Sequence, residues 1–161
     1  AYSAQSYHLP NYRHLSSSSL GRYKGSEIFM THDEYYMPYF TRSELACKGS
    51  GKIFLAEGFA DKLLILREQF NQPMIVTSCC RSFEYNAKIG GATNSFHIYD
   101  HPTRQVPGTA AIDIGMIENS TRGKLINLAW NLGWNIGIHK NFLHLDRRTD
   151  YTDSPQIVFV Y

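Results

Sequence analysis

Two histidines and one aspartate lie in segments whose other residues are largely apolar: His97 in NSFHIY, Asp113 in TAAIDI and His144 in FLHLD. Burying such groups is costly unless something pairs with them. Histidine and carboxylate side chains are also the usual ligands of a catalytic zinc ion, which takes three protein ligands and keeps a fourth position open. The three residues therefore form a candidate zinc site, and such a site performs metal-assisted hydrolysis.

Each of these residues also fits a plainer interpretation, a hydrogen-bonded polar group inside a protein core. Fifteen residues separate His97 from Asp113. The separations match no short metal-binding motif such as H-E-x-x-H. Residue types and spacing alone therefore leave a metal site and a polar core about equally open.

Short apolar segments place two of the candidate ligands on β-strands. Side chains alternate between the two faces of a strand, so Asp113 and His144 take positions where an apolar residue would otherwise point. Strands are predicted at 73–78, 109–114, 134–138 and 142–146, with 156–160 closing an edge.

Two longer helices are predicted at 54–70 and 119–133. The first has one apolar face, made of Leu55, Phe59, Leu63, Leu66 and Phe70. The second has Ser120 or Thr121 as its N-terminal cap and Gly133 as its stop. Both helices therefore have a side to bury.

Two shorter helical segments complete the pattern. RSFEYNAKIGG (81–91) is predicted to be a brief helix that ends at its glycines. Thr41, followed by Glu44, opens a short helical turn. Helices packed on one side of a small, largely antiparallel sheet make an α+β domain, which is the fold class that we predict.

Residues 1–40 differ in composition from the folded domain that we predict for residues 41–161. They hold seven of the eleven tyrosines and show no regular helical or strand period. Tyrosines offer a large contact area at a low cost in side-chain entropy. We expect these residues to form an extended arm that lies on its own domain or on a neighbouring chain, in a virion or another oligomer.

The overall composition excludes several classes of function. The formal net charge is only +2, and no run of Lys and Arg would follow a phosphate backbone, so a nucleic-acid partner is not expected. No stretch approaches the ~18 apolar residues of a membrane span, and the first 30 residues lack the apolar centre of an export signal. Three cysteines, two of them adjacent, are expected to be reduced thiols.

Several motifs occur in the order that a known family shows. The segments TSCCRSFEYNAKIGGATNSFH, GTAAIDIG and FLHLDRR resemble the zinc D-alanyl-D-alanine carboxypeptidases and related peptidoglycan endopeptidases, in their short phage and bacterial form. The superfamily also includes the hedgehog signalling domain. The resemblance covers about residues 40–148 and rests on several separate motifs that agree.

The resemblance implies roles for individual residues. His97, Asp113 and His144 would be the ligands of a Zn²⁺ ion. Arg81 would grip the substrate and polarise its carbonyl group, and Ser95, two places before the first ligand, would bind substrate.

Two departures from the family pattern concern catalysis. The chain has a longer segment between His97 and Asp113 than the family pattern, which predicts a loop over 100–107 at the rim of the site. Asp100 and His101 in this loop are candidate ligands or substrate contacts. A solvated loop without such a role is the simpler interpretation. Many relatives have an acidic residue three places before the last histidine, where this chain has Asn141. An amide cannot accept a proton.

Another residue must therefore be the general base. Asp146 is on the same strand face as His144 and is the candidate catalytic base. Asp146 could equally orient an imidazole as a carboxylate behind the metal ligands. His139 is a weaker candidate for the base.

The function implied is zinc-dependent hydrolysis of a peptide bond in bacterial cell-wall peptidoglycan, with stem or cross-link peptides as substrates. We expect a virion-associated protein, or one made in the cytoplasm of a phage host that then acts on the cell wall. The alternative is a structural or binding module of a larger assembly, such as a phage particle, that keeps the fold with little or no activity. The tyrosine-rich arm, the long loop and Asn141 favour this alternative.

Overall fold

The computed structural model describes residues 35–115 and 118–161. Most of the expected arm, residues 1–34, lies outside the described residues. The elements are β1 (Tyr35–Met37), β2 (Phe40–Thr41), α1 (Arg42–Leu45), α2 (Phe59–Phe70), β3 (Val76–Ser78), α3 (Phe83–Lys88), β4 (Ala111–Gly115), α4 (Asn119–Asn131), β5 (Asn135–Ile138), β6 (Phe142–Asp146), α5 (Arg148–Tyr151) and β7 (Val158–Val160). Among the described residues, none of the helices has the length and apolar character needed to cross a membrane.

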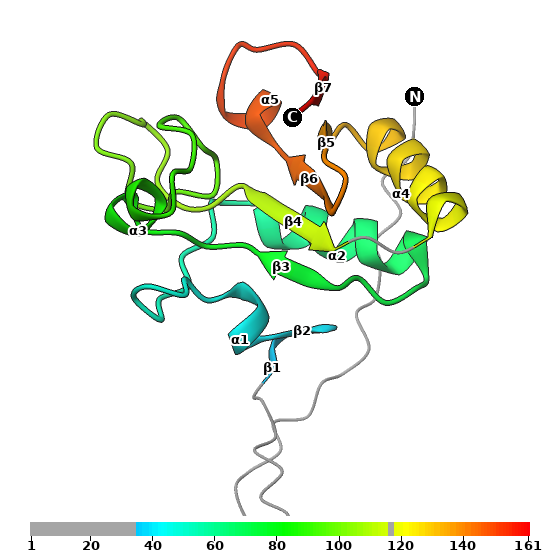
Figure 1. The fold of residues 1–161 in the computed structure, drawn as a ribbon, viewed down its shortest axis with the longest axis horizontal. Helices are drawn as coiled ribbons and strands as arrows, with labels where there is room; N and C mark the ends of the chain where they lie inside the picture. The colour runs from blue at the N-terminus through cyan, green and yellow to red at the C-terminus, as the bar shows by residue number, and fades with distance from the viewer. Residues whose placement is uncertain (1–34, 116–117) are drawn as a thin grey trace, which may run out of the picture. The chain divides into compact units, whose positions relative to one another are not determined.

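The main sheet has five strands in the order β3-β4-β6-β5-β7 (Figure 1). All neighbouring strands are antiparallel except β5 and β7, which are parallel. The predicted α+β class with a largely antiparallel sheet is confirmed. Strand β6 spans the predicted residues, and β7 takes an edge as expected. Strands β1 and β2 form a separate two-stranded sheet, which the sequence did not predict.

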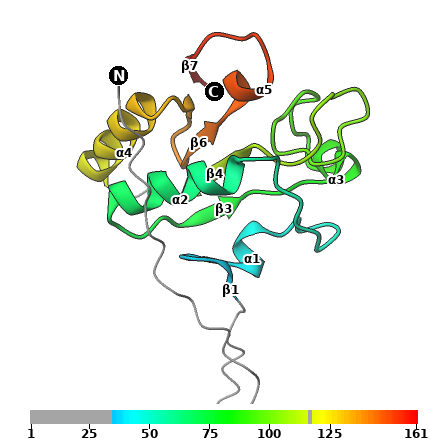
Figure 2. The same ribbon diagram turned by 180° about the vertical axis from the view of Figure 1, so that it is seen from behind.

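One face of the main sheet packs against helices α2 and α4; α2 lies in front of the strands in Figure 2. The predicted apolar face of α2 is buried through Phe59, Leu63, Leu66 and Phe70. On the sheet side, Ile112, Ile114, Leu143 and Leu145 are nearly inaccessible to solvent. Burial of one such side chain stabilises the fold by about 1.5–3 kcal/mol. This apolar layer fixes which residues point to the opposite face.

Two helix starts differ from the predictions. Helix α2 begins at Phe59 rather than near residue 54, because Leu55 forms a β-bridge with Thr109 and Gly58 adopts a left-handed conformation at φ 76°. The N-cap of α4 is Glu118, not Ser120 or Thr121, because its carboxylate accepts hydrogen bonds from two free backbone N–H groups and suits the positive end of the helix dipole.

The N-terminal turn of α1 matches its prediction. Thr41 is the N-cap, and its side chain and that of Glu44 make the reciprocal hydrogen bonds of a capping box.

The strand register aligns a single row of residues across the sheet. Ser78 on β3 is opposite Asp113 on β4, which is opposite His144 on β6. The row continues to Gly137 on β5 and Phe159 on β7. Because β-strands alternate their side chains, this row lies on the face away from α2 and α4. That face carries the candidate site.

Candidate metal centre

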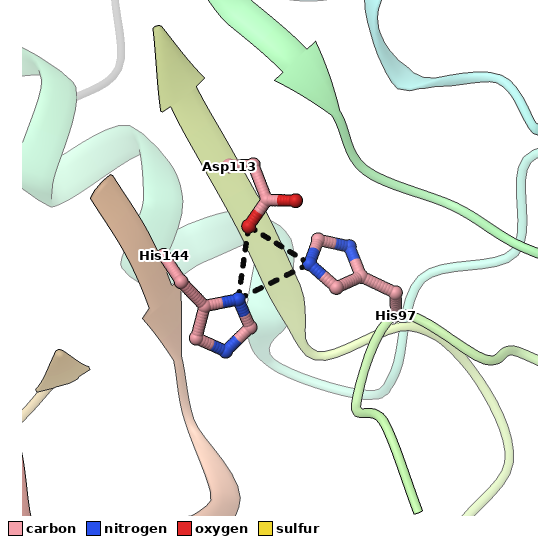
Figure 3. Close-up of side chains that lie close together, drawn as sticks. All are labelled: His97, Asp113 and His144. Atoms are coloured by element: carbon pink, nitrogen blue, oxygen red, sulfur yellow. Dashed lines mark hydrogen bonds and ion pairs between the residues drawn. The ribbon is translucent and has the colours of Figure 1, made fainter. Parts of the chain in front are cut away.

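The three candidate ligands meet at one point on this face (Figure 3). His97 Nε2 lies 3.1 Å from Asp113 Oδ1 and 3.2 Å from His144 Nδ1. His144 Nδ1 lies 2.9 Å from the same aspartate oxygen. All three residues are at most 5% exposed. The structure therefore brings together three buried donor atoms from β4, β6 and the segment between α3 and β4.

The outer nitrogen of each imidazole faces a hydrogen-bond acceptor. His97 Nδ1 lies 2.6 Å from the carbonyl oxygen of Cys79, and His144 Nε2 lies 2.9 Å from Asp146 Oδ2. An acceptor requires a proton on the nitrogen that faces it, which assigns the tautomer of each neutral ring. The inner nitrogens of both neutral rings then carry lone pairs. A second layer of acceptors that fixes ring tautomers in this way is typical of metal-binding histidines.

Three electron-rich atoms that converge in a buried site repel one another unless a cation or a shared proton lies between them. Two nitrogens and one carboxylate oxygen suit zinc. For tetrahedral coordination at bond lengths of about 2.0–2.1 Å, ligand atoms lie about 3.3 Å apart. The observed separations of 2.9–3.2 Å are close to this value. The donor set therefore fits a zinc ion.

The protonation states of two ligands already suit a metal. Burial lowers the pKa of His97, which favours the neutral ring. Burial opposes ionisation of Asp113, but the neighbouring His97 and His144 outweigh it and hold the pKa of this carboxyl well below its usual range. Burial also disfavours a charged His144, yet its hydrogen bonds with Asp113 and Asp146 raise its pKa. A proton on Nδ1 of His144 and a metal ion thus compete for one position.

Arg81 lies beside the ligands, just after the end of β3. Its Nη2 donates to Asp113 Oδ2 at 2.9 Å, and its Nε donates to Ser78 Oγ at 2.9 Å. Asp113 thus gives one oxygen to Arg81 and turns the other toward the histidines. The arginine side chain remains 14% exposed, so part of it can meet a ligand. Its predicted role in gripping substrate stays a prediction.

Asp146 contacts the outer side of His144. Besides its contact with Nε2 of that ring, it accepts hydrogen bonds from the backbone N–H of Arg148 at 3.0 Å and from Arg148 Nε at 2.9 Å. The residue is fully buried, and its pKa is lowered to about 2, because hydrogen bonds from His144 and Arg148 outweigh the opposing effect of burial. This placement favours the orienting role over the role of general base, which stays a prediction.

The remaining residues singled out in the sequence lie around this centre. Ser95 Oγ accepts a hydrogen bond from the backbone N–H of His97 at 3.3 Å, so it shapes the turn that presents the ligand. Asp100 accepts from the backbone N–H of Phe83, and His101 Nε2 contacts the carbonyl oxygen of Thr93. Within the described ranges, neither belongs to the candidate metal-binding group.

Hydrogen bonds hold the loop over 100–107 against the turn that presents His97. Arg104 donates to the carbonyl oxygens of Ser95 and Ile98, and its guanidinium lies 4.2 Å from the centre of the Phe96 ring. The insertion therefore supports the segment that carries His97.

Sequence reasoning did not find the aromatic residues near His144. Phe159 on β7 and Tyr161 just after it lie 5.9 and 6.4 Å from the His144 ring, centre to centre. Phe142 precedes that histidine by two positions and lies 5.4 Å from Tyr161. The alternation in VFVY was a usable signal, because it places Phe159 and Tyr161 on one face of an edge strand.

One of the three cysteines contacts the candidate metal centre, through its main chain. Cys47, Cys79 and Cys80 are free and buried. The main-chain carbonyl of Cys79 holds His97, so it is the backbone at this position that contributes to the centre.

An α+β domain with a buried His–Asp–His group beside an arginine defines a candidate metallohydrolase. A comparison with protein families matches residues 38–146 to Peptidase M15, which is more than half of the chain. The chain therefore belongs to the Peptidase M15 family, a family of zinc peptidases, and the predicted family is confirmed. A search of curated proteins finds no significant match.

Proposed function

We propose that the protein is a zinc-dependent peptidase that hydrolyses a peptide bond in bacterial cell-wall peptidoglycan, of the D-alanyl-D-alanine carboxypeptidase or endopeptidase type. One observation carries the proposal. The inner atoms of His97, Asp113 and His144 converge within 2.9–3.2 Å, while acceptors hold the outer nitrogens of both rings. Membership of a peptidase family supports hydrolysis as the use of this arrangement.

Each residue of the candidate site has its own role in the proposed reaction. His97, Asp113 and His144 would hold the zinc ion, which when bound supplies a Lewis acid and an activated water. Arg81 holds Oδ2 of Asp113 by a hydrogen bond and offers a fixed positive charge to a substrate carbonyl or carboxylate. Asp146 keeps the His144 ring oriented. The burial of the ligands limits access of bulk water to the site.

The substrate class is a stem or cross-link peptide of peptidoglycan, by resemblance to the family's short phage and bacterial form. A phage-associated role follows from the same resemblance. The exposed part of Arg81 suits such a peptide, because guanidinium groups bind carboxylates well.

A release assay tests the proposal. Zinc-loaded protein is incubated with purified peptidoglycan and with a synthetic stem pentapeptide ending in D-Ala-D-Ala, and the products are identified by mass spectrometry. We expect release of D-alanine or of cross-link fragments, lost on chelation and in His144→Ala. His101→Ala is the matched control, because this histidine contacts the loop and not the metal-binding group. Failure of zinc-loaded protein to cleave either substrate would contradict the proposal.

The alternative, a structural or binding module, is favoured by one observation. Both buried carboxylates of the site already accept hydrogen bonds, Asp113 from Arg81 and Asp146 from Arg148, and the pKa of each is lowered, which makes both weak acceptors of a proton from water. A chain that binds zinc but releases no peptide from any cell-wall preparation would support this alternative.

A further inference from the structure

An aromatic surface borders the metal centre on the side of β5 and β7. It consists of Phe142, Phe159 and Tyr161, and we call it the aromatic wall. The rings of Phe159 and Tyr161 lie 5.4 Å apart, as do those of Phe142 and Tyr161. Tyr161 lies edge-on to His144, with 6.4 Å between ring centres. The wall thus contacts one of the three candidate ligands.

The backbone holds the aromatic wall in place. Strand β7 pairs with β5, and the N–H of Tyr161 donates to the carbonyl oxygen of Ile138 at 3.1 Å. Gly137 lies beneath the rings in the same sheet row as Asp113 and His144. A Cβ atom at Gly137 would lie 2.7 Å from the Phe159 ring and 2.9 Å from that of Tyr161. The absence of a side chain there lets the rings approach the centre.

The phenol of Tyr161 lies beside the candidate ligands and is open to solvent, because its ring contacts that of His144 and the residue is 63% exposed. Among the contacts of the described residues, its hydroxyl makes no hydrogen bond, so its donor is available to a ligand.

Tyr161 and Arg81 flank the ligands from opposite sides. Arg81 follows β3, at one edge of the sheet, and Tyr161 follows β7, at the other edge. Asp113 and His144 lie on the two strands between them that pair with each other. A peptide that reaches the ligands therefore has a donor on each side.

We propose that Tyr161 is a substrate-binding residue whose hydroxyl donates a hydrogen bond to the carbonyl oxygen of the scissile peptide bond. The inference rests on the proposed peptidase function. Negative charge develops on that oxygen during hydrolysis, so the hydrogen bond strengthens on the way to the transition state. Tyr161 keeps its proton throughout, since an ordinary phenol is neutral near pH 7. Phe142 and Phe159 position the ring and make no polar contact with the substrate.

Tyr161→Phe tests this role, because it removes the hydroxyl and keeps the ring. Loss of one such donor typically costs about 10²–10³-fold in kcat. We expect a loss of about 10²-fold in kcat with a KM within a few-fold of that of the unaltered protein, and unchanged zinc content. Tyr151→Phe is the matched control: its hydroxyl donates to the carbonyl oxygen of Glu57 instead, so both constants should stay the same.

A binding measurement gives a second readout without turnover. A phosphinate analogue of the D-Ala-D-Ala dipeptide mimics the tetrahedral carbon and its charged oxygens, and its Kd for the zinc-loaded protein is measured by calorimetry. Tyr161→Phe should weaken this binding about 10–100-fold, and Tyr151→Phe should not.

The two readouts separate the inference from the proposed function. If Tyr161→Phe matched the unaltered protein in kcat and in phosphinate affinity, the role of Tyr161 would be refuted while the peptidase function stood. If the unaltered protein bound the phosphinate but cleaved nothing, the proposed function would fail. The difference in phosphinate Kd between Tyr161→Phe and the unaltered protein would still show whether the Tyr161 hydroxyl contacts the bound molecule. Binding of neither substrate nor phosphinate would overturn both.

Discussion

The clearest single perturbation of the site is Asp146→Asn. This residue is fully buried, holds Nε2 of His144 at 2.9 Å and pairs with Arg148. Asparagine keeps the size of the side chain and removes its charge. The sequence suggests Asp146 as the general base, whereas its hydrogen bonds favour an orienting role. The two roles predict different results.

The expected losses of zinc affinity and of stability follow from the contacts of Asp146. Loss of a carboxylate that orients a ligating histidine costs about 10–100-fold in metal affinity, or about 1.4–2.7 kcal/mol. Breaking a buried ion pair costs about 3–5 kcal/mol of stability. The cost here is lower, because the Arg148 side chain is 24% exposed. Since a domain has only about 5–15 kcal/mol in total, the variant should be weakened but folded.

The assay measures zinc affinity and turnover separately. Zinc Kd is determined by competition with a chromophoric chelator, and kcat is determined at saturating zinc. We expect Asp146→Asn to raise the Kd about 10–100-fold and to recover much of its turnover when zinc is in excess. Asp150→Asn is the matched control, since Asp150 also pairs with an arginine, Arg147, but has no contact with the ligands. It should bind zinc normally.

One result would refute this reasoning. If Asp146→Asn bound zinc as tightly as the unaltered protein but lost about 10²–10⁴-fold in kcat, the loss would be that of a general base. The orienting role would then be wrong, and the role predicted from the sequence would stand.

Three further predictions follow from the same contacts. His144→Ala should reduce zinc to well below one ion per chain by elemental analysis, whereas His101→Ala should not; an unchanged value in His144→Ala would remove it from the ligand set. Arg81→Lys should lower kcat/KM more than tenfold with zinc retained, because a lysine cannot hold Ser78 and Asp113 together; equal kinetics would exclude a substrate role. The pKa of Asp146 is lowered to about 2 by His144 and Arg148, and that of Asp150 is lowered by Arg147 and Lys62, in each case against burial. Such carboxylates stabilise the fold fully above their unfolded pKa of about 4, so the unfolding free energy of the zinc-free protein should fall between about pH 4 and 2. Urea titrations should show a shallower fall in Asp150→Asn, and an identical fall would contradict its part in this effect.

The sheet could be predicted because its pattern is local. In FLHLD, alternation alone indicates both the strand and the face on which His144 lies. The start of α2 could not be predicted, because Leu55 keeps the helical period yet pairs with Thr109, a contact between residues far apart in the sequence. The cap at Glu118 was missed because hydroxyl residues next to it are equally good caps by propensity.

The candidate ligands were predictable from residue types and the family resemblance, but their surroundings were not. The contact of the His97 ring with the Cys79 carbonyl involves backbone, which has no sequence signal. Whether Asp146 lies in front of the His144 ring or behind it depends on side-chain rotamers that the strand period leaves open. Tyr161 lies beyond the motifs that carry the resemblance, and it reaches the site only because β7 pairs in parallel with β5.

The central claim is that one zinc ion binds between His97, Asp113 and His144. Anomalous diffraction at the zinc absorption edge, from crystals of the zinc-loaded protein, tests this claim most directly. The predicted result is one strong peak at about 2.0–2.2 Å from His97 Nε2, Asp113 Oδ1 and His144 Nδ1. A fully loaded crystal without a peak there, or with its zinc at the thiols of Cys79 and Cys80, would contradict it.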